Sequence, residues 1–314
     1  MDEKKYNIIF FGTPEFSVSS LDALLNIPSI TVSAVFTQPD KKVGRRQKAL
    51  SSQVKNYALT HDIPIYQPEN IKGNSFQSFF SSLKPDAVVL VAYGKIIPET
   101  LLTIPAFGWL NVHASLLPLL RGASPIQHAI LQGMDTTGVT LMKIVKKLDA
   151  GPVFAQKSVN IQPRENFQSL HDTLSQLGGK ILQQSLIPYL AGSLTPQNQN
   201  EVNATFCKQL SKKDGQIDWS KSAIEIDRFI RAMTPWPGAY TSLKGSNLII
   251  LSSHCIEKNT SKDYGILSTT DDELVVSTTQ GSLVVDTLQQ EGKKKLSASQ
   301  FINGYGKILP VQLS

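Results

Sequence analysis

Short apolar runs recur along the first half of the chain, and they limit its possible folds more than any other feature. Each run has five to seven residues and is followed by a helical or polar segment. The runs are Tyr6–Phe11, Ile30–Phe36, Ala87–Ala92, Trp109–His113 and Thr140–Val145. Strands that alternate with helices form a mostly parallel sheet with both faces covered. We therefore predict an α/β domain with a Rossmann-like layout.

The second half of the chain follows a different pattern. Apolar residues between Ser169 and Leu190 recur at spacings of three, four and seven, which predicts a packing helix. A polar, amide-rich stretch follows, as in a linker. A short helix over Ser222–Met233 and closely spaced β-like runs then predict a small barrel or sandwich. The predicted organisation is a first domain at 1–190, a linker at 191–208 and a second domain at 209–314.

Composition excludes several classes of protein. A length of 314 residues with 41% hydrophobic content suits two globular domains rather than a disordered chain. No apolar run approaches the roughly 20 residues that span a membrane, and the charged start Met1–Tyr6 shows no secretory signal. Two distant cysteines, Cys207 and Cys255, suit neither a zinc site nor a disulfide framework. We expect a cytoplasmic protein with no metal, no membrane contact and no stable protein partner.

Positive charge is concentrated in one short stretch. No acidic residue occurs from 41 to 61, and Gly44 favours a flexible loop over a helix. The basic residues of this loop are Lys41, Lys42, Arg45, Arg46 and Lys48. Such a loop is either a solvated surface feature or an arm that contacts nucleic-acid phosphates.

A candidate active site begins at the end of the run Trp109–His113. Alternate side chains of a strand point to the same side, so Asn111 and His113 face one point. An amide can donate a hydrogen bond to a developing oxyanion, and an imidazole can carry a proton. Pro118 cannot continue a central strand, so the chain turns there. This is the layout of an acyl-transfer site, although on spacing alone a surface or capping role stays open.

The turn after the first run argues against one common ligand of such sheets. Dinucleotide binding needs three spaced glycines, whereas Gly12–Ser17 has one, and Glu15 would repel a pyrophosphate. We therefore do not expect NAD to bind.

Several separate motifs occur in the order found in a known family. They are Phe11–Phe16, Phe36–Asp40, Ala92–Pro98, Asn111–Pro118, Arg121–Ile126, Leu148–Gly151 and Pro235–Ala239. In these motifs the chain resembles the folate-dependent formyltransferases, and within them the methionyl-tRNA formyltransferases, over nearly its whole length. The resemblance implies a formyltransferase catalytic domain followed by an OB-like barrel that contacts tRNA.

The resemblance also implies a reaction and a set of catalytic residues. The formyl group of 10-formyltetrahydrofolate would pass to the α-amino group of methionine on initiator tRNA, directly and through a tetrahedral intermediate. Asn111 would donate to the oxyanion, and His113 would polarise the formyl oxygen or carry a proton. Asp149 would orient the imidazole or a bridging water and draw the proton from the amine.

Folate and tRNA contacts follow from the same resemblance. The turn Ser115, Leu116, Leu117 and Pro118 would place its backbone against folate, and Ala92, Tyr93, Gly94 and Ile96 would form an apolar wall for the pterin. The basic loop at 41–48 matches an insertion that approaches the acceptor end of the tRNA. Smaller formyltransferases of purine synthesis lack this insertion.

The chain departs from the family pattern at four positions. Leu119 and Leu120 stand where a basic residue and an aromatic residue are usual, Lys147 stands for a glycine, and Pro152 stands for an acidic residue. Lys147 and its neighbour Lys146 would offset the lost cation. Two other functions stay open at this stage: formyl transfer to a small amine, and RNA binding by a protein that has lost catalysis.

Overall fold

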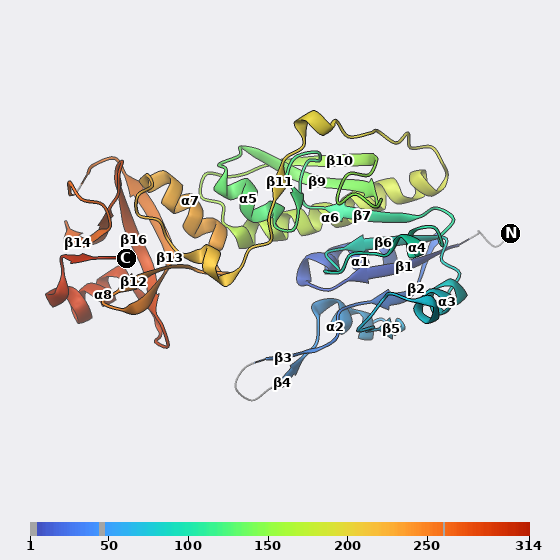
Figure 1. Ribbon diagram of the computed structural model, residues 1–314, viewed down its shortest axis with the longest axis horizontal. Helices are drawn as coiled ribbons and strands as arrows, with labels where there is room; N and C mark the ends of the chain where they lie inside the picture. The colour runs from blue at the N-terminus through green and yellow to red at the C-terminus, as the bar shows by residue number, and fades with distance from the viewer. Residues whose placement is uncertain (1–4, 44–47, 260) are drawn as a thin grey trace. The chain divides into compact units, whose positions relative to one another are not determined.

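The computed structural model describes residues 5–43, 48–259 and 261–314 (Figure 1). Contacts within the chain define two compact units. The first unit gathers the described residues up to Pro125 with Thr136–Asn160 and His171–Cys207. The second gathers Ile126–Asp135, Ile161–Leu170 and Lys208–Ser314. The domain boundaries at residues 190 and 209, which the sequence predicts, stay a prediction.

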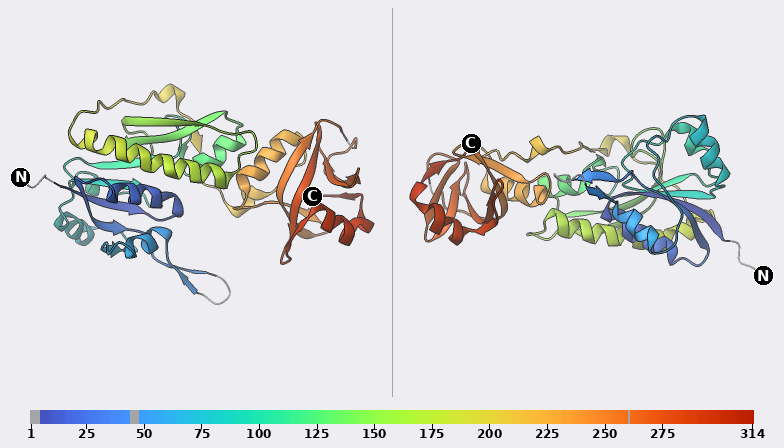
Figure 2. Two further views of the ribbon diagram at one scale, coloured as in Figure 1. Left: turned by 180° about the vertical axis from the view of Figure 1, so that it is seen from behind. Right: turned by 90° about the horizontal axis from the view of Figure 1, so that it is seen from below.

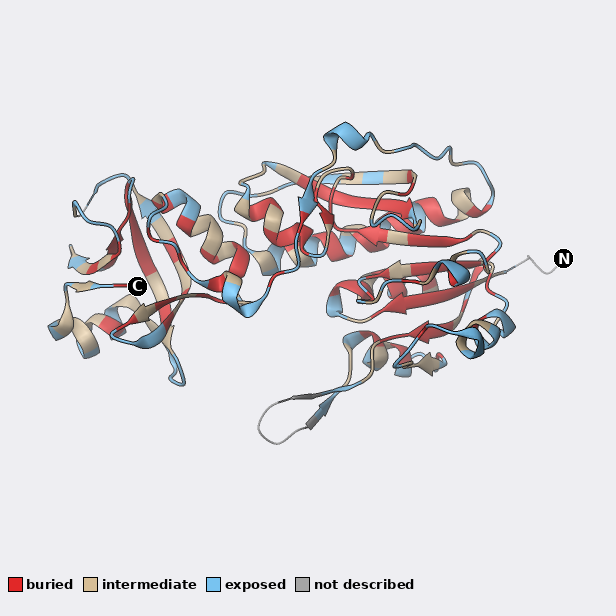
Figure 3. Ribbon diagram, in the orientation of Figure 1, coloured by how far each residue is buried: buried red, intermediate tan, exposed pale blue. Residues whose placement is uncertain are grey.

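The first unit is built on a seven-stranded sheet in the order β10-β9-β7-β6-β1-β2-β5. Its strands are β1 (Tyr6–Gly12), β2 (Ile30–Phe36), β5 (Ile65–Tyr66), β6 (Ala87–Val91), β7 (Trp109–His113), β9 (Thr136–Lys143) and β10 (Val153–Asn160). Strands β1, β2, β5, β6 and β7 pair in parallel, whereas β9 and β10 are antiparallel. Figure 3 shows the central strands as largely buried. The predicted mostly parallel α/β class is confirmed.

Helices cover both faces of this sheet. They are η1 (Glu15–Ser17), α1 (Val18–Leu25), α2 (Gln53–Leu59), α3 (Asn74–Ser82), α4 (Glu99–Leu102) and α6 (Phe167–Leu190). Helices α1 and α6 lie along one face (Figure 2), where an added Cβ at Gly179 of α6 would lie 2.7 Å from the Ser19 carbonyl oxygen. On the other face, Phe80 of α3 stacks on Trp109 of β7 with ring centroids 5.5 Å apart. The packing helix predicted between Ser169 and Leu190 is therefore present as α6.

Two small ribbons accompany the first sheet. In one, β8 (Arg121–Gly122) pairs in parallel with β11 (Phe206–Cys207). In the other, β3 (Lys41–Val43) pairs antiparallel with β4 (Lys48–Leu50), and Figure 1 shows both extending away from the sheet. The sequence predicted a loop over this basic stretch, but its described ends are strands. The predicted linker likewise contains β11 and a 3-10 turn, η2 (Glu201–Asn203).

The second unit is an antiparallel half-barrel with its own core. Its elements are α5 (Pro125–Leu131), η3 (Lys212–Gly215), α7 (Ala223–Met233), β12 (Ala239–Leu243), β13 (Ser246–Ile256), β14 (Ile266–Thr270), β15 (Glu273–Ser277), β16 (Ser282–Gln290), β17 (Lys295–Ser297), α8 (Ala298–Tyr305), η4 (Gly306–Ile308) and β18 (Val311–Gln312). The strand order is β12-β13-β16-β15-β14-β18, with β17 on β16. Backbone hydrogen bonds between Ser242 and Ser314 link β12 to the segment after β18, so the sheet curls. The predicted small β-barrel class is confirmed in this form.

Candidate functional site

The predicted site residues come mainly from loops at one edge of the first sheet. Because β2, β6 and β7 are parallel, the segments that follow them leave the sheet at the same edge. Ligands of such sheets bind beyond the carboxyl ends of the strands. The three segments are 37–52, Ala92–Pro98 and Ala114–Leu120, which hold the predicted tRNA and folate residues.

Asn111 and His113 are the third and last residues of β7, so the alternation of side chains in a strand puts both on the same side. Trp109, two residues earlier, is buried in the core on that side. His113 is buried, whereas Asn111 is partly exposed. The His113 Nε2 atom lies 3.0 Å from the carbonyl oxygen of Leu120. A carbonyl oxygen can only accept, so Nε2 carries the proton in this contact and Nδ1 is left to gain or lose one.

Asp149 reaches His113 by a route that the sequence did not predict. In a fully parallel sheet, both residues would lie just past strand ends at one edge. Strand β9 runs antiparallel to β7, however, so its last residue, Lys143, pairs with Leu110 near the start of β7. The loop of residues 144–152 returns from there and places Asp149 Oδ2 3.8 Å from His113 Nδ1. A loop that doubles back along the sheet therefore brings the Asp149 carboxylate close to the imidazole.

The Asp149 carboxylate is held between the imidazole and the backbone. Its Oδ2 atom accepts a hydrogen bond of 2.8 Å from the amide of Gly122 in β8. Only 12% of the Asp149 side chain and 7% of the His113 side chain are exposed. Asp149 also has a φ of 48°, a left-handed conformation that non-glycine residues adopt only at some cost. A sheltered imidazole with a carboxylate facing Nδ1 can hold a proton there and pass it on.

The turn after β7 is fixed by three polar side chains. Thr140 of β9 donates from its hydroxyl to the Ser115 carbonyl oxygen at 2.6 Å and accepts from the Leu117 amide at 3.1 Å. Gln156 of β10 donates to the Leu117 carbonyl oxygen at 2.9 Å. Within the turn, the Ser115 hydroxyl donates to the Leu119 carbonyl oxygen at 2.5 Å, so this hydrogen bond spans Pro118. These contacts give Ser115–Pro118 a defined shape.

The segment after β6 presents a mixed surface. Ala92 and Gly94 have positive φ values of 46° and 87° and are exposed, and Ile96 is 85% exposed. Tyr93 points the other way, into the core, where burial raises its pKa to about 12. Its carbonyl oxygen accepts from the Thr13 hydroxyl and the Gln38 amide. Ile96 can therefore contribute apolar surface to a ligand, whereas the Tyr93 ring supports the loop from beneath.

The basic stretch is only partly described. Lys41 is exposed and pairs with Leu50, and the backbones of Lys42 and Lys48 lie in β3 and β4. Arg45 and Arg46 lie outside the described residues. This ribbon leaves the sheet just after β2, at the same edge as the segments that follow β6 and β7.

Sequence reasoning missed a polar cluster around the Asp149 loop. Arg121 is completely buried and binds both Gln199 and Glu201, which belong to the predicted linker. Gln199 donates to the carbonyl oxygens of Asp149 and Gly151. The amide-rich composition of 197–203 predicted a linker and none of these contacts. The signal that could have revealed these contacts was the arginine in the Arg121–Ile126 motif, because a buried arginine needs acceptors.

The departures from the family pattern are accommodated by local contacts. Lys147 donates to Glu201 at 2.5 Å, and Lys146 lies 3.2 Å from Glu99. Leu120 is buried and supplies the carbonyl oxygen that His113 contacts. The Pro152 carbonyl oxygen accepts from the Lys143 amide. Both lysine ammonium groups thus have carboxylate partners. This does not favour the expectation that Lys146 and Lys147 replace the tRNA-binding basic residue that the family has and this chain lacks.

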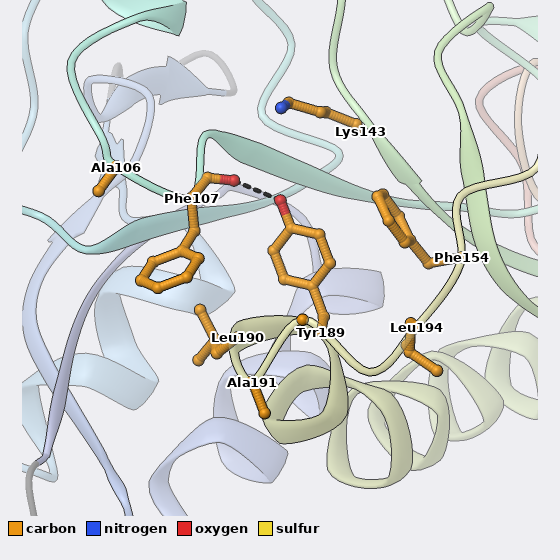
Figure 4. Close-up of a pocket in the computed structure, with 9 residues that line it drawn as sticks. Ala106, Phe107, Lys143, Phe154, Tyr189, Leu190, Ala191 and Leu194 are labelled. Atoms are coloured by element: carbon orange, nitrogen blue, oxygen red, sulfur yellow. Dashed lines mark hydrogen bonds between the residues drawn. The ribbon is translucent and has the colours of Figure 1, made fainter.

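A separate pocket lies away from these residues. It has a volume of about 440 Å³ and lies at the amino end of β7, where Tyr189 donates a hydrogen bond to the Phe107 carbonyl oxygen (Figure 4). Lys143 and Phe154 also line it, and none of the predicted site residues does. In the part of the chain that the structure describes, no group of His, Cys, Asp or Glu residues could hold a metal ion. Over the same residues, no helix is long and apolar enough to cross a membrane.

Comparison with known proteins first defines the class. Residues 4–186 match the formyl transferase family, and residues 209–306 match the formyl transferase C-terminal domain. The fold is shared with WlaRD, a sugar 3N-formyl transferase, at a TM-score of 0.64 and 19% identity over 94% of this chain and 100% of that one. An N-formyltransferase from Helicobacter canadensis gives a TM-score of 0.63 and 18% identity over 91% and 99% of the two chains. The chain is a folate-dependent formyl transferase.

Sequence relatives then define the particular family. The methionyl-tRNA formyltransferase of Methylococcus capsulatus is 41% identical over 95% of this chain and 96% of that protein. The Bacillus subtilis methionyl-tRNA formyltransferase is 40% identical over 95% and 94% of the two chains. The chain therefore belongs to the methionyl-tRNA formyltransferase family, which confirms the resemblance read from its motifs.

Proposed function

We propose that this protein transfers the formyl group of 10-formyltetrahydrofolate to the α-amino group of methionine on initiator tRNA. The product, formyl-methionyl-tRNA, serves translation initiation. The observation that carries this proposal is the pairing of His113 with Asp149 beside Asn111, in a chain that matches its relatives over both domains. We place the reaction in the cytoplasm, with initiator methionyl-tRNA as partner and with no membrane or stable protein partner.

Asn111 stabilises the charge that develops during transfer. When the amine attacks the formyl carbon, the formyl oxygen becomes an oxyanion. Asn111 is partly exposed at the end of β7, so its side-chain amide can donate to that oxygen. Removal of one such donor typically costs 100- to 1000-fold in kcat. No covalent bond to the protein is needed.

His113 and Asp149 together move the proton. The nitrogen that attacks must lose a proton, and the N10 atom that leaves must regain one. His113 Nε2 is committed to the Leu120 carbonyl oxygen, so proton exchange occurs at Nδ1, beside the Asp149 carboxylate. The carboxylate stabilises the imidazolium that forms when Nδ1 accepts the proton.

Folate and tRNA approach from the edge where the site loops leave the sheet. The turn Ser115–Pro118 offers a shaped backbone, and Ile96 with its neighbours Ala92 and Gly94 offers exposed apolar surface for a pterin. The basic residues of the β3–β4 region, Lys41, Lys42, Arg45, Arg46 and Lys48, contact phosphates of the acceptor end. These roles are the ones that the family motifs imply. The hydrogen bonds that fix the turn Ser115–Pro118 support its role as the folate-binding backbone.

The test is a transfer assay with purified protein. We expect wild-type protein to formylate methionyl-initiator tRNA and His113→Ala to lose at least about 100-fold in kcat, because general acid–base catalysis contributes that much or more. The matched control is His61→Ala, an exposed histidine on the segment after α2, which should leave kcat unchanged. Tight tRNA binding without transfer by the wild type would indicate an RNA-binding protein that has lost catalysis. Absence of both would redirect the search to small amines.

A further inference from the structure

The segment between the two matched family domains is fastened to the loop that carries Asp149. The backbone of Gln197 exchanges two hydrogen bonds of 2.8 Å with Val153, at the start of β10. Further along, Thr205 accepts at its hydroxyl from the Leu120 amide and at its carbonyl oxygen from the Arg121 amide. We call this segment, residues 197–207, the strap.

Gln199 of the strap uses every hydrogen-bonding position of its side chain. Its Nε2 atom donates to the carbonyl oxygens of Asp149 and Gly151, both at 2.8 Å. Its Oε1 atom accepts from Arg121 Nε at 3.0 Å and Nη2 at 2.8 Å. A primary amide has two N–H donors and two acceptor lone pairs, so the set is complete. The side chain therefore fixes the backbone on both sides of Ala150.

Arg121 gives Gln199 a rigid support. The Arg121 side chain is fully buried, and its Nη1 and Nη2 atoms contact the two carboxylate oxygens of Glu201 at 3.1 and 3.0 Å. A bidentate pair of this kind fixes orientation as well as distance. Because Gln199 accepts from the same guanidinium, its own amide cannot rotate without loss of those bonds.

The Asp149 carboxylate is tied to the strap by a second connection. Its Oδ2 atom accepts from the Gly122 amide at 2.8 Å, and Gly122 pairs in register with Cys207 of the strap. The approach is close, since an added Cβ at Gly122 would lie 2.2 Å from the Cys207 carbonyl oxygen. Both the backbone and the carboxylate of Asp149 thus depend on the strap, and Asp149 has a φ of 48° that surrounding contacts must maintain.

We propose that Gln199 is a positioning residue, which holds the Asp149 carboxylate against His113 by fixing the backbone of the 144–152 loop. The proposal rests on the function proposed above, because it assigns Asp149 a part in proton transfer. Gln199 itself does not touch the reacting groups. A displacement of about 1 Å at a catalytic group can cost on the order of 100-fold in rate.

The test uses the near-isosteric change Gln199→Glu in the full-length protein. A carboxylate keeps both acceptors for Arg121 but loses both donors to Asp149 and Gly151. We expect kcat for formyl transfer to fall about 100-fold, while KM for 10-formyltetrahydrofolate and for methionyl-tRNA stays within about two-fold, because neither substrate contact is removed. The control is Gln197→Glu, the same change at an exposed strap residue whose contact with Val153 is made by backbone. An unchanged kcat, or a raised KM with kcat unchanged, would overturn the proposal.

A second readout does not depend on activity. In protein labelled with ¹⁵N-glycine, the Gly122 amide should exchange its hydrogen at least about ten times faster in Gln199→Glu than in Gln197→Glu, since its acceptor on Asp149 has moved. Equal exchange in the two variants would refute positioning by Gln199. If wild-type protein transfers no formyl group, the proposed function fails, and this exchange measurement still decides whether Gln199 positions Asp149.

Discussion

The Glu201 carboxylate connects a fully buried cation to the protein surface. Hydrogen bonds from Arg121 and then from Lys147 hold its pKa at about 2, below the ordinary value of 4.5. A carboxylate whose pKa is lower in the folded state stabilises the fold above the unfolded pKa. That contribution is complete above about pH 4.5 and is lost as pH falls from about 4.5 to about 2.

The direction of this pKa shift predicts how the stability of a Glu201 variant depends on pH. At pH 7 we expect Glu201→Gln to have a lower Tm than the wild type, because Arg121 loses its charged partner. The difference in Tm should shrink progressively between about pH 4.5 and about pH 2 as the wild-type carboxylate is protonated. Thermal unfolding followed by circular dichroism at several pH values measures it. A Tm difference that stays constant from pH 7 to pH 3 would contradict the assigned pKa shift.

At the scale of elements, the β3–β4 ribbon extends from the sheet edge that also bears the site loops. Lys41 at its base is exposed, and Lys55 nearby is engaged with Asp40 at 2.7 Å. Charges on an exposed ribbon contribute little to folding. We therefore expect these positive charges to act in tRNA binding, where contacts with phosphates release counterions.

The corresponding prediction concerns salt dependence. Replacement of Lys41, Lys42, Arg45, Arg46 and Lys48 by Ala should weaken tRNA binding and make the log–log dependence of the binding constant on salt less steep by up to about 4.5, at roughly 0.7 to 0.9 per contact. Filter binding at several salt concentrations measures the slope. Lys180→Ala, at an exposed position of α6, is the control cation and should leave it unchanged. If the variant with all five substitutions keeps the wild-type slope, the ribbon does not bind phosphates.

At the scale of the whole molecule, each of the two units has its own apolar core. Phe80 and Trp109 belong to one core, and Phe301 with Leu274 belongs to the other. Phe301 is completely buried in the half-barrel, where it stacks on Tyr305. Truncation of Phe301 alone should therefore measurably destabilise the core of the second unit.

We predict that Phe301→Ala lowers the free energy of unfolding of the second unit by about 3–5 kcal/mol, the usual loss when a buried phenylalanine is truncated. Urea unfolding would measure the change. Ile224→Ala on α7 removes apolar atoms from a side chain that is 53% exposed, and it should change stability by no more than about 0.5 kcal/mol. Equal effects of the two substitutions would show that Phe301 does not hold this core together.

The sequence alone determined the features that depend on local pattern. The apolar runs correspond to strands, and alternation places Asn111 and His113 on one side of β7. The helix predicted at Ser169–Leu190 is present as α6, two residues longer at its start. These predictions succeed because side-chain direction and the burial of strands follow from residues close together in the chain.

The assembly of the site depends on contacts that are made only when the whole chain is folded. The reversed direction of β9, the return of the Asp149 loop and the strap all depend on contacts between distant residues: Gly122 meets Asp149 across 27 positions, and Leu120 meets Thr205 across 85. A polar side chain such as Gln199 has the same local sequence signature whether water or a carbonyl oxygen receives its hydrogen bonds. The choice between them is made by burial, which only the folded chain defines.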